Sequence, residues 1–249
     1  IRPAETVVMV CAGVFMSAFK GGIYIPLLLL LFMIPKRNFG EKVKYPVVVA
    51  SAILLAVVTF AAVNSNIFKD VSSSTSGSEN ELMWTESEGF TLRRMFTHPK
   101  EALCMLFNTF FLMGGTHYAE MFASGFGWLQ IYTSGFLTAG FTVLMVLTLL
   151  NCEGREICFN KKQRIISLSA AAVSIFIIVI SMWIFWTPAG SSHIVGLQGR
   201  YFIPLLFCAV YPLKNSRCII KKDIGGGIIF AAVMFHALTF WEIYIRMAV

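Results

Sequence analysis

The stretch IISLSAAAVSIFIIVISMWIFW, residues 165–186, decides the fold class of this chain. It contains no charged residue, and about 20 mostly apolar residues are enough for a helix to cross the hydrocarbon core of a bilayer. Of the 249 residues in the chain, 57% are hydrophobic and only 13% are charged, whereas roughly a quarter of the residues of a soluble domain are charged. We therefore expect an integral membrane protein that has the lipid bilayer as its solvent.

Six further segments are apolar enough to cross a bilayer. Two of them, residues 23–34 and 202–213, are short, so their ends must extend into flanking residues or be covered by neighbouring helices. The expected fold class is all-α, a polytopic helical membrane protein with about seven transmembrane helices. The spans are predicted at Glu5–Phe19, Ile23–Ile34, Pro46–Val63, Ser134–Leu150, Ile165–Trp186, Phe202–Leu213 and Ile224–Ile245.

The basic residues predict how these spans are oriented. The formal net charge is +7, and three short links, residues 35–45, 151–164 and 214–223, hold 12 of the 20 lysines and arginines. Lysine and arginine accumulate in the cytoplasmic loops of membrane proteins, so this charge indicates topology and not a nucleic-acid partner. With seven spans all three links are cytoplasmic, the N-terminus of this multi-pass chain is inside, and its C-terminus is outside.

An eighth apolar segment, residues 102–115, does not fit this topology as a span. If it crossed the bilayer, the three basic links could not all be cytoplasmic. We predict instead an interfacial or re-entrant helix on the outer face, ended by Gly114-Gly115. The chain is then a single transmembrane domain, residues 1–249, with an outer loop at 64–101 and the interfacial helix and re-entrant connection at 102–133.

The outer link TPAGSSHIVGLQGRY, residues 187–201, ends in a charge placed directly against an apolar segment. Charges at membrane depth are expensive and tend to face a cavity or a partner. Gln198 offers an amide, Gly199 allows close approach, and Tyr201 adds an aromatic hydroxyl, so Arg200 and these neighbours could bind a phosphate and an adjoining sugar. The alternative is that Arg200 is an interfacial anchor.

Four further residues are candidates for binding an anion on the same face. Arg93 and Arg94 precede a predicted helix start, at which Thr97 or His98 is the cap and a proline occupies the first turn. The arginines are either a phosphate clamp or anchors that reach lipid phosphates, and His98 is a candidate general base. Lys20 lies where the first two spans turn, either as an anchor or facing an anion in a polar cavity.

No pattern in the sequence is typical of a metal or cofactor site. Cys152 and Cys158 have no adjacent histidine and are poorly spaced for zinc. The outer loop carries glutamates that we expect to form a charged segment exposed to solvent. The alternative is that one of them is a base or a metal ligand. They are Glu79, Glu81, Glu86 and Glu88. We therefore expect no cofactor, and no residue pattern supports a divalent metal. Glu120 is the only charged residue in the segment 114–136, which makes it a target for mutation.

Four blocks of the sequence, taken together, resemble the bacterial membrane family catalogued as domain of unknown function 2142. They are GLQGRYFIPLL, RRMFTHPKEALCMLFNT, GFGWLQ and SAFKGGIYIPLLLL. The resemblance extends over essentially the whole chain. It corresponds to the C-terminal part of a longer family member, in agreement with a chain that begins at Ile1 without an initiator methionine.

That family is similar to the membrane-embedded, polyprenyl-phosphate-dependent glycosyltransferases of the C-type fold. The resemblance implies a polyprenyl-phosphate sugar donor and a glycan acceptor. It also implies inverting transfer on the outer face of the bacterial cytoplasmic membrane, for assembly of cell-surface polysaccharide. Carried over residue by residue, it favours site-lining positions whose individual roles stay unassigned. They are Gln198, Arg200, Tyr201, Lys20, Arg93, Arg94 and His98.

The chain departs from the C-type pattern in one respect. Those enzymes generally place a catalytic acid in their first large outer loop, whereas the first outer turn here is only residues 20–22. We expect the acid upstream of this fragment, which alone would then be inactive. The alternatives are a non-enzymatic transporter or flippase of a lipid-linked or anionic substrate, for which interrupted spans are typical, and a structural membrane subunit.

Overall fold

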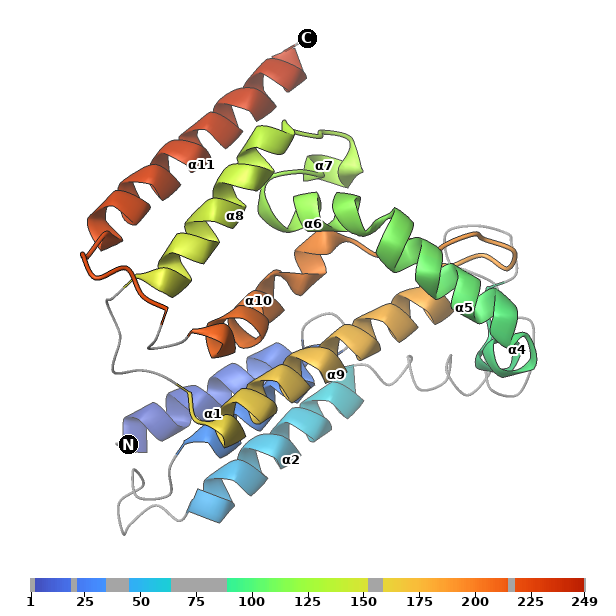
Figure 1. Ribbon diagram of the computed structural model, residues 1–249. Helices are drawn as coiled ribbons and strands as arrows, with labels where there is room; N and C mark the ends of the chain where they lie inside the picture. The colour runs from blue at the N-terminus through green and yellow to red at the C-terminus, as the bar shows by residue number, and fades with distance from the viewer. Residues whose placement is uncertain are drawn as a thin grey trace. The chain divides into compact units, whose positions relative to one another are not determined.

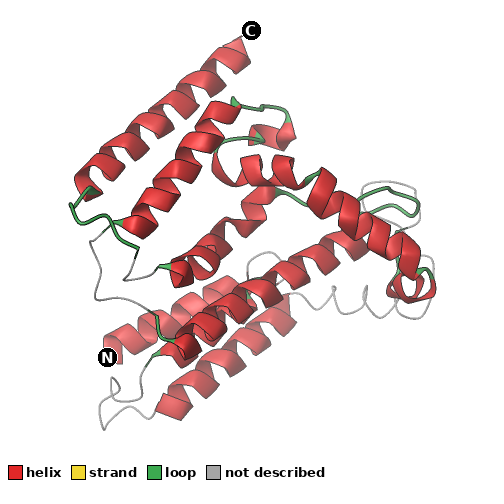
Figure 2. Cartoon of the chain, in the orientation of Figure 1, coloured by secondary structure: helices red, strands yellow, loops and turns green. Residues whose placement is uncertain are grey.

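The computed structural model contains helices and no strand within the residues that it describes (Figure 2). Those residues are 3–18, 22–34, 45–63, 89–151, 159–214 and 218–248. Backbone groups in a lipid environment must be hydrogen-bonded within the protein, and a helix satisfies this within its own segment. The all-α fold class predicted from hydropathy is therefore confirmed for the described part of the chain.

Three of the described helices are long and apolar enough to cross a membrane, and each matches a predicted span. Two of the other apolar segments, residues 135–150 and 199–213, form shorter helical stretches. The exact number of seven spans stays a prediction. The three long helices are α2 (Tyr45–Val63), α9 (Lys161–Trp186) and α11 (Gly225–Ala248).

The chain divides into two compact units, each made from two separate stretches of sequence. Unit 1 comprises residues 1–108 and 161–196, and unit 2 comprises residues 109–160 and 197–249. The prediction of a single domain was based on hydropathy, which does not resolve such a division. The two units are described separately below.

Unit 1 is built on α2, α9 and α1 (Pro3–Ala18), with α1 packed against α2 (Figure 1). Small residues line the packed faces: Ala52 and Ala56 of α2 and Ala170 of α9 are fully buried. Small side chains let helix backbones approach closely, which is the usual basis of helix packing in membranes. Unit 1 is therefore held together by the small-residue stripes of the same helices that hydropathy identifies.

The second predicted span forms a 3₁₀ helix, η2 (Ile25–Met33), which packs on α9. A 3₁₀ helix rises about 2.0 Å per residue against about 1.5 Å for an α-helix, so this short segment is stretched. The turn before it uses Gly22, whose φ is +74°. A Cβ at Gly22 would lie 2.5 Å from the ring of Phe60, so both the backbone angle and the packing require glycine.

The predicted helix start near residue 98 is confirmed. Helix α4 (Leu92–Thr97) is followed by α5 (Pro99–Phe107), with His98 as the N-cap residue and proline in the first turn. A π-helical turn, η4 (Asn108–Leu112), comes next. The predicted end at Gly114-Gly115 is wrong, because these glycines begin α6 (Gly114–Phe122). Neither has the left-handed φ with which a glycine ends a helix.

Unit 2 contains α6, α7 (Phe126–Leu129), α8 (Gly135–Leu150), α10 (Ile203–Val210) and α11. Helices α8 and α11 lie side by side (Figure 1). At one end of this pair Glu242 accepts hydrogen bonds from the backbone N–H (2.7 Å) and hydroxyl (2.9 Å) of Ser134. A carboxylate at the N-terminus of α8 also interacts favourably with the helix dipole.

At the other end of the pair, Asn151 and Asp223 connect the end of α8 with the start of α11. Asn151 Nδ2 donates to Asp223 Oδ1 (3.2 Å), and Asn151 Oδ1 accepts from the backbone N–H of Ile224 (3.2 Å). Hydrogen bonds from the backbone N–H of Gly225 and then from Asn151 hold the pKa of Asp223 below its ordinary value. The pair of packed helices α8 and α11 in unit 2 is thus hydrogen-bonded at both ends.

Candidate functional site

The predicted site turn begins at Gln198 and continues as a short 3₁₀ helix, η5 (Gly199–Phe202), which leads directly into α10. Gly199 is buried against α6, and a Cβ on it would lie 1.8 Å from the backbone oxygen of His117. Its φ is not in the left-handed region, so glycine is required here by close approach and not by backbone angle. The turn therefore packs so closely on α6 that there is no room for a side chain at position 199.

Glu120 on α6 is the residue that holds this turn. Its Oε2 accepts a hydrogen bond of 2.6 Å from the backbone N–H of Gly199, and Nδ1 of His117 lies 3.4 Å away. Glu120 is only 7% exposed. A buried carboxylate is costly unless it is hydrogen-bonded, so these contacts explain how the charge is tolerated inside unit 2.

Arg200 projects from the turn with its side chain exposed. Its Nε donates to Oε1 of Gln198 (2.7 Å), and its Nη1 makes a longer contact of 3.5 Å with the backbone oxygen of Gly127. The ion pairs found among the described residues do not include Arg200. Both of its acceptors are neutral, so the guanidinium retains its full positive charge and further N–H donors for an anion.

Tyr201 completes the turn and precedes the predicted span. Its backbone N–H donates to the backbone oxygen of Gln198 (3.0 Å). Burial raises the pKa of the Tyr201 phenol, the positive charge of Arg200 opposes this effect, and the negative charge of Glu120 reinforces it. A phenol at its ordinary pKa is already neutral at physiological pH, and the raised pKa moves Tyr201 further from ionisation; a neutral hydroxyl can both donate and accept a hydrogen bond.

The candidates of unit 1 have different surroundings. Arg94 makes a two-point ion pair with Glu101, with Nε–Oε2 and Nη2–Oε1 distances of 3.2 and 3.1 Å, and lies over the ring of Phe90 at 5.3 Å. Its guanidinium is thus paired with an acid. Arg93 is exposed, as is His98, whose Nδ1 lies 2.9 Å from the hydroxyl of Thr97.

The remaining candidates lie outside the described residues. They are Lys20 and the four glutamates of the loop, Glu79, Glu81, Glu86 and Glu88. Of the seven predicted positions, Gln198, Arg200 and Tyr201 are brought together in unit 2, whereas the arginines before α5 and His98 belong to unit 1.

Residues 1–209 match the family model described as predicted membrane protein, DUF2142. The chain belongs to the DUF2142 family. No curated protein and no solved structure matches the chain. The family match ends within α10 and includes both Glu120 and the turn that it holds. The family resemblance seen in the four sequence blocks is confirmed.

Two of the four DUF2142 blocks meet in unit 2. The block GFGWLQ contains Gly125 and Gly127, both with a positive φ, and the backbone oxygen of Gly127 lies 3.5 Å from Nη1 of Arg200. A Cβ on Gly125 would lie 2.8 Å from Cγ of Glu120. Gly127 of this block therefore contacts Arg200, and Gly125 lies against the buried Glu120.

Glu120 is the functional candidate that sequence reasoning left without a role. A single acid in an otherwise uncharged apolar segment is the signal that marked it, because such residues usually pair inside the protein. Its partner, Gly199, is 79 residues away and offers only a backbone N–H. Among the described residues, no group of three or more His, Cys, Asp or Glu side chains is placed to hold a metal ion.

Proposed function

We propose that this chain is part of a membrane glycosyltransferase that binds a polyprenyl-phosphate-linked sugar at the Gln198–Tyr201 turn, on the outer face of the membrane, for cell-surface polysaccharide assembly. One observation carries the proposal: Arg200 is exposed and, within the described part of the chain, its hydrogen-bond acceptors are neutral, while the turn that carries it is fixed to the buried acid Glu120. An arginine held in this way is prepared to bind a phosphate through two N–H groups.

The chemistry of such a transfer explains why a cation is useful at this position. The bond between the anomeric carbon and the donor phosphate oxygen breaks, and a bond from that carbon to an acceptor hydroxyl oxygen forms. The departing polyprenyl phosphate gains negative charge, which Arg200 would stabilise most strongly in the transition state. The amide of Gln198 and the neutral phenol of Tyr201 are suited to hydroxyls of the sugar.

The proposal is tested by Arg200→Ala in the full-length protein in its native membrane. A charged hydrogen bond contributes about 1.5–3 kcal/mol, which corresponds to a loss of roughly 10- to 150-fold in transfer. We expect the rate of glycan transfer to fall by that factor while the protein level stays normal, and Arg200→Lys to restore part of the activity. Lys221→Ala, an exposed cation outside the site, is the matched control. Unchanged glycan in Arg200→Ala at normal expression would contradict the proposal.

A transporter or flippase is the second candidate, and interrupted helices favour it. The 3₁₀ helix η2 and the 3₁₀ turns on both sides of α10 are breaks of the kind that line substrate paths in transporters. A transporter predicts that cysteines introduced as Lys20→Cys and Arg200→Cys react with impermeant reagents from both faces in a substrate-dependent way. Reaction from the outer face alone would argue for the glycosyltransferase.

A further inference from the structure

Helix α9 indicates the membrane depth of the segments bonded to it in unit 1. It is long and apolar enough to cross a membrane, and its uncharged part, residues 165–186, measures about 33 Å at about 1.5 Å per residue. That length is close to the roughly 30 Å of a hydrocarbon core, so α9 ends at the membrane surface. Its last residue, Trp186, is of a type that is enriched at this boundary.

The segment that carries α4 and α5 is hydrogen-bonded near both ends to the residues that follow α9. Before α4, the backbone N–H of Phe90 donates to the backbone oxygen of Thr187 (3.1 Å). After α5, Nδ2 of Asn108 donates to the backbone oxygen of Ser192 (2.8 Å). Because Thr187 directly follows the spanning helix, these bonds hold α4 and α5 at the level of the lipid headgroups.

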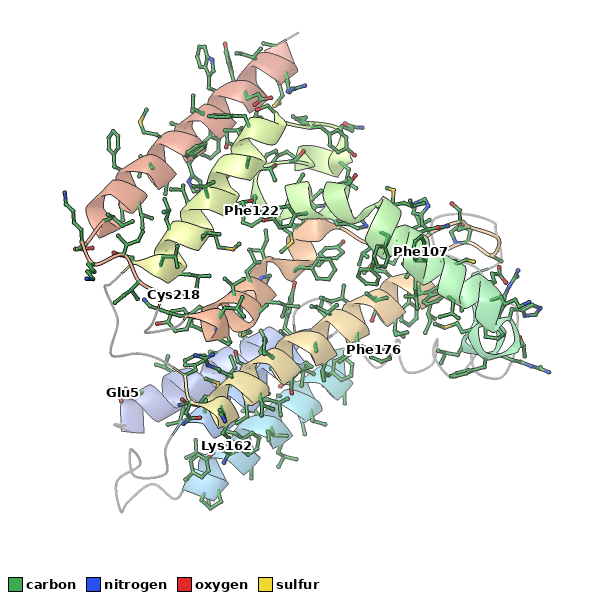
Figure 3. The ribbon with its side chains drawn as sticks, viewed as in Figure 1. Glu5, Phe107, Phe122, Lys162, Phe176 and Cys218 are labelled. Carbon is green, nitrogen blue, oxygen red and sulfur yellow. The ribbon has the colours of Figure 1, made fainter. Side chains whose placement is uncertain are left out.

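Helix α5 has a buried face and an exposed apolar face. Ala102 and Met105 are buried, whereas Leu103 and Phe107, which lie one turn apart, are 67% and 54% exposed (Figure 3 labels Phe107). Phe96, in the last turn of α4, is 83% exposed. Exposed apolar patches mark contacts with a membrane or a partner. With nine residues, α5 is about 14 Å long and too short to cross a bilayer, which leaves a position along the membrane surface.

The cations of this segment favour a lipid surface as the partner. Arg93 and Lys100 are exposed, and the ion pairs found among the described residues include neither of them. Glu101, the only acid between residues 91 and 108, is paired with Arg94. Exposed apolar side chains combined with excess positive charge are typical of helices that lie in a membrane interface. The charge is complementary to lipid phosphates, which the flexible side chains of arginine and lysine can reach.

We infer that α4 and α5 form a lipid-binding element, with Phe96, Leu103 and Phe107 among the outer parts of the lipid tails and with Arg93 and Lys100 on lipid phosphates. The sequence left two alternatives open for this segment, an interfacial or a re-entrant helix and an anchor or a phosphate clamp. On this inference α5 is interfacial and Arg93 is an anchor. The inference does not depend on the proposed function, because these residues belong to unit 1 and the proposed donor site belongs to unit 2.

The test places a spin label at Leu103 or at Phe107 of the full-length protein in lipid nanodiscs. The label is attached through a genetically encoded ketone residue, so the native cysteines stay in place. Its collisions with oxygen, which concentrates in lipid, and with a water-soluble nickel chelate report its surroundings. Phe176, exposed on α9, is the lipid reference, and Lys221, exposed before α11, is the water reference. We expect both labels to collide more with oxygen and less with nickel than a label at Lys221.

The other possible surroundings of this face give different results. A preference for nickel at both positions, equal to that at Lys221, would mean that the face lies in water. Few collisions with either reagent would mean that another protein covers it. Either result overturns the inference. The labels at Leu103 and Phe107 are measured in separate proteins, so the test remains if one of them does not fold.

The contribution of the cations is measured in anionic nanodiscs with the label at Phe107. We expect Arg93→Gln combined with Lys100→Gln to move the label toward water, with more nickel collisions and fewer oxygen collisions. Lys221→Gln combined with Lys222→Gln, at two exposed cations of unit 2, is the matched control and should leave both collision rates unchanged. Unchanged collision rates in the Arg93 and Lys100 double variant would overturn the assignment of these cations to lipid phosphates.

Discussion

At the scale of single residues, the buried Glu120 is the main determinant of the candidate site. It accepts the backbone N–H of Gly199 and so fixes the turn from which the Gln198 and Arg200 side chains extend. Burying a carboxylate that is 7% exposed costs desolvation free energy, which offsets much of the stability that its hydrogen bonds contribute. Its presence is better explained by the position that it imposes on the turn.

Replacing Glu120 should therefore affect ligand binding through Arg200. Glu120→Ala leaves the Gly199 N–H without its acceptor, at a cost of about 1–3 kcal/mol, whereas Glu120→Gln keeps an acceptor. We expect lower affinity for a prenyl phosphate in Glu120→Ala and a smaller loss in Glu120→Gln. Thr116→Ala on the same helix is the control.

The distinguishing measurement is a double-mutant cycle of Glu120→Ala with Arg200→Ala, with prenyl phosphate affinity as the readout. If Glu120 acts by positioning Arg200, the double variant should bind no more weakly than Arg200→Ala alone. Fully additive losses would indicate that Glu120 is only a stabilising residue.

Gly199 provides a second test of the same contact. A methyl group at this position would overlap the backbone oxygen of His117, which cannot rotate away as a side chain can. We expect Gly199→Ala to destabilise the protein by about 1–3 kcal/mol and to weaken prenyl phosphate binding. The measurements are thermal unfolding and ligand affinity, with Gly127→Ala as a comparison, because a Cβ there meets no neighbour and only its positive φ opposes substitution. Equal stability of Gly199→Ala and wild type would contradict the described packing.

At the scale of elements, hydropathy located the three long helices α2, α9 and α11, but it did not predict helix α6 or the geometry of the shorter segments. The segment Ile23–Ile34 was predicted as a span, and apolar composition alone does not distinguish the 3₁₀ helix η2 from an α-helix. Similarly, the pair Gly114-Gly115 was predicted to end a helix, because sequence does not reveal whether a glycine takes a positive φ. Backbone conformation at both places depends on neighbours that are distant in sequence.

The packed helices α8 and α11 have a pH-dependent contact at one end of the pair. Hydrogen bonds from Gly225 and Asn151 lower the pKa of Asp223, so its contribution to stability is present above the ordinary pKa of 3.8 and is lost as the pH falls through the lowered value. We expect Asp223→Asn to unfold at a lower temperature than wild type at pH 7, with the difference shrinking as the pH is lowered below that range. Thermal unfolding at a series of pH values measures it, and a difference that is constant with pH would contradict the contact.

At the scale of the whole molecule, the candidate site was only partly predictable. The spacing of Gln198, Arg200 and Tyr201 in one turn was visible in the sequence, because neighbours in a short turn remain neighbours in space. The contact of that turn with Glu120 was not, since it joins residues 79 positions apart through a backbone N–H that every non-proline residue possesses. Long-range contacts made by the backbone leave no signature in residue type.

The interleaving of the two units has a consequence for how the protein is made. Unit 1 needs α9, which is synthesised only after the first stretch of unit 2, residues 109–160. The helix η2, which packs on α9, must therefore wait in the membrane without that partner. We expect a photoreactive residue in place of Leu27, which is buried in η2, to crosslink to other membrane proteins in a chain stopped after residue 160 and not in a chain extended to residue 196. Insertion factors that shield unfinished membrane helices would act on this protein during that interval. The interval follows from the order of the segments along the chain.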